Sequence, residues 1–216
     1  MRIEGEAHEL SNALFPHGLV PQILRLIVDT WAAFRRPNDA EDEPKITNRF
    51  VRHLQIEKRR QGKRFRVMPH PKDVEGLDPA TGKGYVEIDI YVPYGDDERC
   101  YFGIEAKKLN TTGSGEKWKS NAGEYAGKNG MGCFVDGRYA SHQCEGAMVG
   151  YVMDGDCTKA KASISEAIDK RAEILRVPVP CPLHRAQALP ACPDAFETHH
   201  NLDRGEFTLH HVLLAA

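Results

Sequence analysis

Apolar and polar residues alternate along residues 85–92 of this chain. Successive side chains of a β-strand point to opposite faces of a sheet, so this alternation predicts a strand with one apolar face. The segment is rich in β-branched and aromatic residues, which favour strands. Glu87 and Asp89 would share the polar face. The apolar face would hold four residues: Val86, Ile88, Ile90 and Val92.

A polar run containing Pro and Gly, residues 93–98, follows this strand and predicts a hairpin loop. Residues 100–107 then predict a second strand. Because side chains alternate along a strand, Glu105 and Lys107 would lie on one face of it. In register, the hairpin would bring Asp89 close to Glu105 across the ladder.

In three other segments the apolar residues recur at helical spacing, which predicts helices with one buried face. These helices cover residues 21–35, 44–61 and 158–175. Shorter helices are expected at residues 117–128 and 139–146. Further strands are expected at residues 64–68, 147–153 and 206–214, the last as an edge or closing strand. The proline-rich residues 177–193 predict an irregular connection.

The predicted hairpin gathers two carboxylates and one ammonium group, those of Asp89, Glu105 and Lys107. Two ionised carboxylates repel each other unless a cation lies between them, and hard oxygen ligands favour Mg²⁺. The lysine would place positive charge where a phosphate under attack develops negative charge. This is the chemistry of a metal-dependent phosphodiesterase. The alternative is an ordinary cross-strand ion pair on a solvated hairpin, worth under about 1 kcal/mol.

At these residues the chain resembles the PD-(D/E)xK, or restriction-endonuclease-like, nuclease superfamily. The resemblance rests on Asp89, fifteen intervening residues, and then Glu105, Ala106 and Lys107. It implies that Asp89, Glu105 and the Ala106 carbonyl bind the metal. It also implies that Lys107 orients the attacking water or stabilises the transition state. Ile88 stands where the superfamily motif has a proline, which many members lack.

The superfamily core also has a helix before the hairpin, which usually donates another acidic residue. Here the expected helix 44–61 begins with Pro44, which suits a first helical turn. Residues 43–47 look like the superfamily's Glu-x-x-Ile-Thr helix opening, so Glu43 is the third acidic candidate and Glu41 is the alternative. Acidic residues also suit any helix N-terminus, because they complement the helix dipole.

The resemblance implies an α/β fold with a restriction-endonuclease-like mixed central sheet flanked by helices. Residues 1–40 would form an N-terminal helical extension, and residues 41–216 the nuclease-like domain. The implied activity is endonucleolytic hydrolysis of DNA with Mg²⁺, for which Mn²⁺ can substitute, in a bacterial restriction or phage-defence setting. Such enzymes often pair two active sites, so a homodimer or a partner protein of a defence system is expected. The alternative is a catalytically inactive nuclease-like subunit that binds nucleic acid or a protein partner.

The composition limits how nucleic acid would be bound. With 216 residues and 41% hydrophobic residues, the chain can bury one good core. Its formal net charge of −2 argues against bulk electrostatic wrapping of DNA, so binding requires a local basic patch. Residues 57–66 carry six basic residues and are the candidate for phosphate contacts. No apolar run would span a bilayer and no signal peptide is seen, so a cytoplasmic protein without membrane contact is expected.

Six cysteines, without any CxxC pair, are expected to be free thiols of a reducing compartment. They lie at positions 100, 133, 144, 157, 181 and 192. One cluster, Cys181, His184, Cys192 and His199, offers four zinc ligands, although its spacing matches no recognised zinc finger. Proline-rich loops with Cys and His are common, so an ordinary loop is the alternative.

Overall fold

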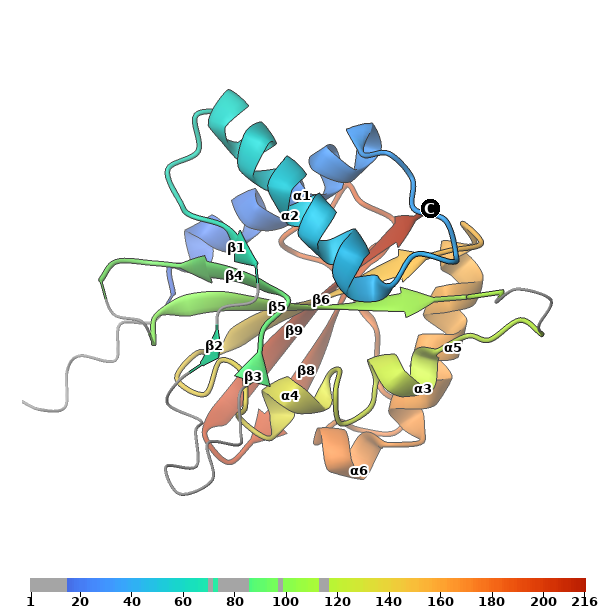
Figure 1. The fold of residues 1–216 in the computed structure, drawn as a ribbon. Helices are drawn as coiled ribbons and strands as arrows, with labels where there is room; N and C mark the ends of the chain where they lie inside the picture. The colour runs from blue at the N-terminus through green and yellow to red at the C-terminus, as the bar shows by residue number, and fades with distance from the viewer. Residues whose placement is uncertain (1–14, 70–71, 74–85, 97–98, 113–116) are drawn as a thin grey trace, which may run out of the picture.

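The computed structural model describes residues 15–69, 72–73, 86–96, 99–112 and 117–216. A mixed seven-stranded sheet runs through the centre, in the order β1-β4-β5-β6-β9-β8-β7 (Figure 1). Its strands are β1 (Met68–Pro69), β4 (Ile90–Pro93), β5 (Tyr101–Leu109), β6 (Glu145–Val152), β7 (His184–Arg185), β8 (Ala195–Leu202) and β9 (Gly205–Ala215). β2 (Lys72–Asp73) and β3 (Val86–Glu87) form a separate antiparallel pair.

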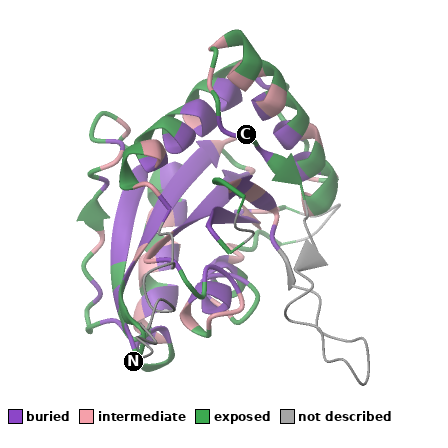
Figure 2. Cartoon of the chain, turned by 90° about the vertical axis from the view of Figure 1, so that its left-hand side faces the viewer, coloured by how far each residue is buried: buried purple, intermediate pink, exposed green. Residues whose placement is uncertain are grey.

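The central strands β5, β6 and β9 are parallel to one another, whereas the outer pairs are antiparallel. Helices cover both faces of the central strands, which explains their nearly continuous apolar sequences. Their packing is close at Gly150, where an added Cβ would lie 2.6 Å from Leu109 Cδ1 and 2.8 Å from Leu213 Cδ2. Figure 2 shows the sheet buried along most of its length, with exposed residues on the outer sides of the helices.

Each face of the sheet has its own apolar core. On one face lie η1 (His17–Leu19), α1 (Val20–Ala33) and α2 (Glu43–Arg60). On the other lie α3 (Ala122–Tyr125), α4 (Gly132–Val135), α5 (Cys157–Asp169) and α6 (Ala172–Leu175). The structure therefore confirms an α/β fold with a mixed sheet flanked by helices.

The described part of the expected N-terminal extension packs directly on the sheet. Trp31 of α1 stacks on Tyr151 of β6, with ring centroids 5.3 Å apart. Its Nε1–H also donates a 2.7 Å hydrogen bond to the Ala215 carbonyl. Phe50 of α2 packs edge-on against the same indole. α1 and α2 thus share one core with the sheet.

The strand expected at residues 85–92 is interrupted, and this prediction was wrong in detail. β3 ends at Glu87 and β4 begins at Ile90, with a bend at Asp89 between them. Ile90 and Val92 pack with α1 and α2, but Ile88 packs in the core on the opposite face. The Asp89 side chain accepts a hydrogen bond from the Ala106 N–H, a contact that replaces the next rung of the ladder. The four residues expected on one face are therefore divided.

Other expectations differ from the structure in extent or position. The helix expected at 158–175 is divided into α5 and α6, and only residues 122–125 of the segment 117–128 are helical. Residues 139–146 form no helix, and only Met68 of residues 64–68 belongs to a strand. The segment 206–214 lies in β9, which pairs with β6 on one side and β8 on the other, so it is central and not an edge strand. β8 itself was not predicted.

Among the described residues, no helix combines the length and apolarity that crossing a bilayer requires. All six cysteines are free, as expected.

A buried histidine network lies under α5 and α6. His200 Nδ1 lies 2.7 Å from the Leu175 carbonyl, which only accepts, so this nitrogen carries the proton. Neutral His200 then accepts at Nε2 from the Thr198 hydroxyl, at 2.9 Å. Thr198 in turn accepts from His211 Nε2, and the Tyr125 hydroxyl donates to His211 Nδ1. This arrangement satisfies both imidazoles in their neutral form, and burial lowers the pKa of His200 to about 4.

Acid should destabilise the fold through this network. Unfolded His200 would titrate near its ordinary value of 6.5, so the unfolded state binds more protons between pH 6.5 and 4. We expect His200 to contribute about 3 kcal/mol of stability above pH 6.5 that is lost as the pH falls to 4. His200→Gln should flatten this part of the curve in urea titrations, whereas His199→Gln, at its exposed neighbour, should leave it unchanged. Equal pH profiles for wild type and His200→Gln would contradict the assignment.

Candidate active site

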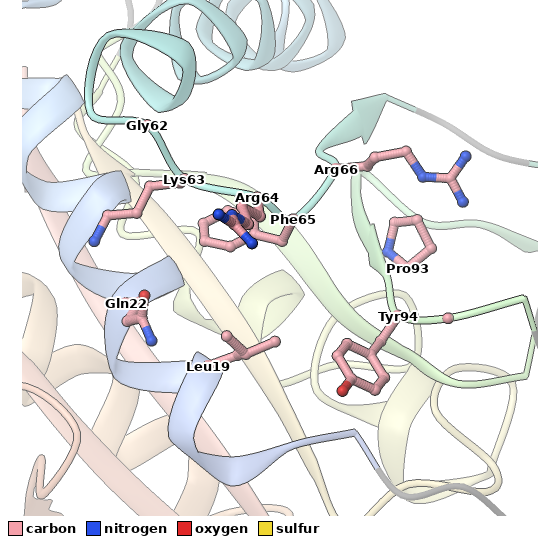
Figure 3. Close-up of a pocket in the computed structure, with 10 residues that line it drawn as sticks. Leu19, Gln22, Gly62, Lys63, Arg64, Phe65, Arg66, Pro93 and Tyr94 are labelled. Carbon is pink, nitrogen blue, oxygen red and sulfur yellow. The ribbon is translucent and has the colours of Figure 1, made fainter.

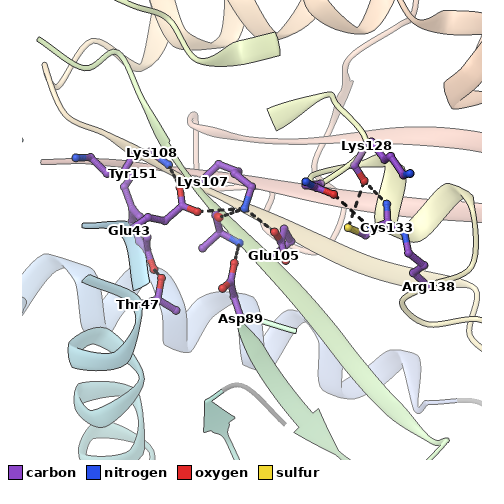
Figure 4. Close-up of polar contacts among 12 residues, drawn as sticks. Glu43, Thr47, Asp89, Glu105, Lys107, Lys108, Lys128, Cys133, Arg138 and Tyr151 are labelled. Carbon is purple, nitrogen blue, oxygen red and sulfur yellow. Dashed lines mark hydrogen bonds and ion pairs between the residues drawn. The ribbon is translucent and has the colours of Figure 1, made fainter. Parts of the chain in front are cut away.

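β5 continues beyond the end of its partner β4, and this exposes backbone donors at the edge of the sheet. The ladder between them ends at the pair Ile90 and Ile104. Past this point, Asp89 Oδ2 accepts from the Ala106 N–H at 2.8 Å, and Glu43 Oε2 accepts from the Lys108 N–H at 2.6 Å (Figure 4). Two carboxylates thus replace the missing strand and are held at one place.

The Lys107 ammonium lies among the groups that the sequence nominated as metal ligands. Its Nζ lies 2.5 Å from Glu105 Oε1, 3.1 Å from Glu43 Oε1 and 3.0 Å from the Ala106 carbonyl oxygen. The three donors of an ammonium group are therefore matched by three acceptors. The Lys107 side chain is 14% exposed and that of Glu105 only 6%. Asp89 accepts from the N–H of the same residue, Ala106. The structure thus brings together all five groups expected from the sequence: Glu43, Asp89, Glu105, the Ala106 carbonyl and Lys107.

The charges at this site are strongly coupled. Burial and the neighbouring charge of Asp89 raise the pKa of Glu105 to about 8, while Lys107 and Tyr139 lower it only in part. Burial alone would lower the pKa of Lys107, but three neighbouring carboxylates outweigh burial and raise that pKa above its usual value. The site therefore holds more acidic groups than its single ammonium group neutralises.

The donor atoms at this site fit a hard divalent cation. Glu105 Oε2 is buried and has no hydrogen-bond partner among the described residues. A buried acceptor without a partner is costly, and a cation would satisfy it. Carboxylate and carbonyl oxygens are ligands that Mg²⁺ accepts. However, the acidic side chains of this site are not compact. Among the described residues, three ligand atoms of His, Cys, Asp or Glu lie within 4.8 Å of one another at one other place, and not here.

Glu43, and not Glu41, is the third acidic residue of this site. Glu43 is the first residue of α2, and its two oxygens contact Lys107 and Lys108. The Glu41 carboxylate instead pairs with Arg49 at 3.1 Å. Only its carbonyl faces the site, where it accepts from Lys108 Nζ at 2.9 Å.

Two further residues support the site and were not singled out from the sequence. Lys108 Nζ donates to the carbonyls of Asp39 and Glu41, and so fixes the segment before α2 beside β5. The alternation along β5 places Lys108 on the α2 side, and this alternation could have indicated its role from the sequence. Tyr139 lowers the pKa of Glu105 through a side-chain hydrogen bond. Nothing in the sequence around Tyr139 indicates this role.

The zinc cluster considered from the sequence does not assemble. His184 and His199 lie with ring centroids 4.7 Å apart. Yet in the part of the chain that the structure describes, no three of Cys181, His184, Cys192 and His199 place their ligand atoms within 4.8 Å of one another. The Cys181 thiol faces the neighbouring Pro182 carbonyl instead.

No family model, no curated protein and no solved structure matches this chain.

Removing the Lys107 charge should destabilise the fold, because it leaves buried carboxylates without a cation. We expect Lys107→Met to lower the free energy of unfolding by about 3 kcal/mol at pH 7, measured by urea denaturation. Adding Glu105→Gln to this variant should restore part of the loss. The matched control is Lys45→Met, whose ion pair with Asp42 is fully exposed and should matter little. Equal effects of the two single substitutions would show that the Lys107 cluster does not contribute as a buried ion pair.

Proposed function

We propose that this chain is a metal-dependent nuclease of the restriction-endonuclease-like kind that hydrolyses phosphodiester bonds of DNA. The observation that carries the proposal is the convergence of Glu43, Asp89, Glu105 and the Ala106 carbonyl around Lys107. These groups come from three separate segments, the start of α2, the bend before β4 and the middle of β5. A solvated cross-strand ion pair would not need this burial or a third acidic residue.

The order of elements also supports the proposal. α2 precedes the β4–β5 hairpin and donates Glu43, as the superfamily resemblance implies. The helices α3 and α4 follow β5, and β6 then returns parallel to β5.

Each residue has a role that follows from its position. Glu43, Asp89, Glu105 and the Ala106 carbonyl would hold Mg²⁺, or Mn²⁺ in its place. The bound ion would stabilise charge on the phosphate oxygens and lower the pKa of a water. Lys107 stays protonated, since its pKa is raised. Its ammonium group would donate to the attacking water or to a phosphate oxygen and hold it in place.

A basic groove at the other end of α2 suits a nucleic-acid backbone. Lys63, Arg64, Arg66 and Tyr94 are among the residues that line this groove of about 490 Å³ (Figure 3). Cationic side chains neutralise phosphates, and an aromatic ring offers a stacking surface. The 18 residues of α2 separate the groove from Glu43 by about 27 Å, a distance that about eight base pairs of DNA would cover.

The rival function is a catalytically inactive nuclease-like subunit that binds nucleic acid or a protein partner. One observation favours it: the Lys107 ammonium already bonds three of the four candidate ligand groups, and so partly compensates their charge without a metal. A bacterial restriction or phage-defence setting, and a homodimer or a partner protein that completes double-strand cleavage, belong to the proposed nuclease.

Removing the acidic ligands should abolish cleavage. Asp89→Asn retains an acceptor for the Ala106 N–H, so the fold should survive while the charge is lost. We expect Asp89→Asn and Glu105→Gln each to lower Mg²⁺-dependent cleavage of a plasmid and oligonucleotide panel at least about 100-fold. Glu41→Gln is the matched control, because its carboxylate faces Arg49, and should leave cleavage unchanged. Undiminished cleavage by both variants would refute the assignment. Wild-type protein that neither cleaves nor releases heat with Mg²⁺ would favour the rival.

Substitutions in the basic groove should weaken DNA binding at every sequence. We expect Arg64→Ala to reduce the slope of log K against log salt by about 1, because one phosphate contact is lost. Fluorescence anisotropy at several salt concentrations measures the slope. Lys170→Ala removes an equal charge from the C-cap of α5, on the other face of the sheet, and should leave the slope unchanged. Equal slopes for wild type and Arg64→Ala would exclude the groove from the DNA path.

A further inference from the structure

A second group of ligand-type side chains lies where η1 meets the beginning of β6. His17 belongs to η1, Glu145 is the first residue of β6, and Cys144 directly precedes it. Each offers one ligand atom, and these three atoms all lie within 4.8 Å of one another. Among the described residues this is the one group of three His, Cys, Asp or Glu side chains that does so. The segments are 127 residues apart in sequence, so the tertiary fold assembles the group.

The pairwise contacts within this group are direct. His17 Nδ1 contacts Glu145 Oε1, and His17 Nε2 lies 4.0 Å from Cys144 Sγ. A nitrogen and a sulfur bound to one tetrahedral zinc, with bonds of about 2.0 and 2.3 Å, lie between 3 and 4 Å apart, at about 3.5 Å. Glu145 and Cys144 face different nitrogens of the ring, whereas one nitrogen binds the ion. Rotation of the His17 side chain, which is 68% exposed, would bring one nitrogen to both ligands.

The glutamate of the group is held by a buried chain of hydrogen bonds. Glu145 Oε2 lies 2.8 Å from His210 Nε2, and His210 Nδ1 lies 3.2 Å from Glu197 Oε1. Glu197 Oε1 also accepts from the backbone N–H groups of Gln187 and Ala188. His210 and Glu197 are 5% and 3% exposed. Outer-shell partners of this kind orient a ligating carboxylate.

The two backbone segments are also fastened together beside the group. Gln143 Oε1 accepts from the Phe15 N–H at 2.7 Å, and its Nε2 donates to the Arg99 carbonyl at 2.8 Å. Gln143 itself is 5% exposed. The ligand group therefore sits on a fixed support and not at a loose chain end.

We propose that His17, Cys144 and Glu145 bind one Zn²⁺ ion. Imidazole, thiolate and carboxylate together suit a borderline-soft ion, in contrast to the oxygen-only set around Lys107. Three protein ligands leave a fourth position for water or another ligand. The ion joins η1, and with it the start of α1, to the first residues of β6. This site stands apart from the proposed nuclease centre, because Glu105 pairs with Met148, three residues farther along β6.

Cobalt titration of the full, chelator-treated chain tests this proposal, since Co²⁺ reports its ligands through its absorption spectrum. In wild type a thiolate-to-cobalt band in the near ultraviolet, with tetrahedral bands in the visible, should saturate at one equivalent of thiolate-bound Co²⁺. Zn²⁺ should displace these bands. Cys144→Ser should lose the thiolate band, and His17→Gln should weaken binding at least about 10-fold. His17 is exposed, so that variant keeps its fold.

Two controls separate this site from other thiols and from the nuclease proposal. His142→Gln changes an exposed histidine two residues from Cys144 and should leave the cobalt spectrum unchanged. Asp89→Asn should also leave it unchanged, whatever its effect on DNA cleavage. No thiolate band in wild type, or the same band in Cys144→Ser, would overturn the zinc site. Loss of the band in Asp89→Asn would likewise overturn it as a separate site.

Discussion

The candidate site depends on the contacts of the Lys107 ammonium group with the acidic groups around it. β5 extends beyond β4, so its edge presents N–H groups that no strand satisfies, and the carboxylates of Asp89 and Glu43 accept from them. Glu105 adds a third acidic group, almost fully buried. Carboxylates this close and this buried require compensating positive charge. Lys107 supplies it by contacting Glu43, Glu105 and the Ala106 carbonyl at once.

This arrangement links stability to chemistry. One ammonium group stabilises an acidic cluster that exceeds it in charge, and Glu105 Oε2 keeps no hydrogen-bond partner among the described residues. The same excess of acidic groups that raises the pKa of Glu105 also favours a divalent cation. In the proposed nuclease, Glu43, Asp89, Glu105 and the Ala106 carbonyl would hold the metal ion, and Lys107 would donate to water or phosphate.

Three polar clusters with different chemistry lie against the sheet. Around Lys107 the ligands are oxygens only, which suits Mg²⁺, whereas His17, Cys144 and Glu145 offer nitrogen, sulfur and oxygen, which suits Zn²⁺. Between α5, α6 and β9 a third cluster, with His200 and His211, is complete with neutral imidazoles alone.

The sequence by itself determined the local features that depend on neighbouring residues. Alternation and the polar loop predicted the β4–β5 hairpin with Asp89 opposite Glu105, and helical spacing predicted α1 and α2 within two residues of their observed bounds. The spacing of Asp89, Glu105 and Lys107 identified the candidate site.

Tertiary structure decided the rest. The bend at Asp89 arises from a hydrogen bond to Ala106, seventeen residues away, and the choice of Glu43 over Glu41 from contacts across 64 residues. The sequence predicted β9 as an edge strand, because a strand's own sequence does not reveal its neighbours. Its central position follows from its pairing with β6 and β8. His17 and Cys144 meet only because η1 packs beside β6, a long-range contact that no local pattern encodes.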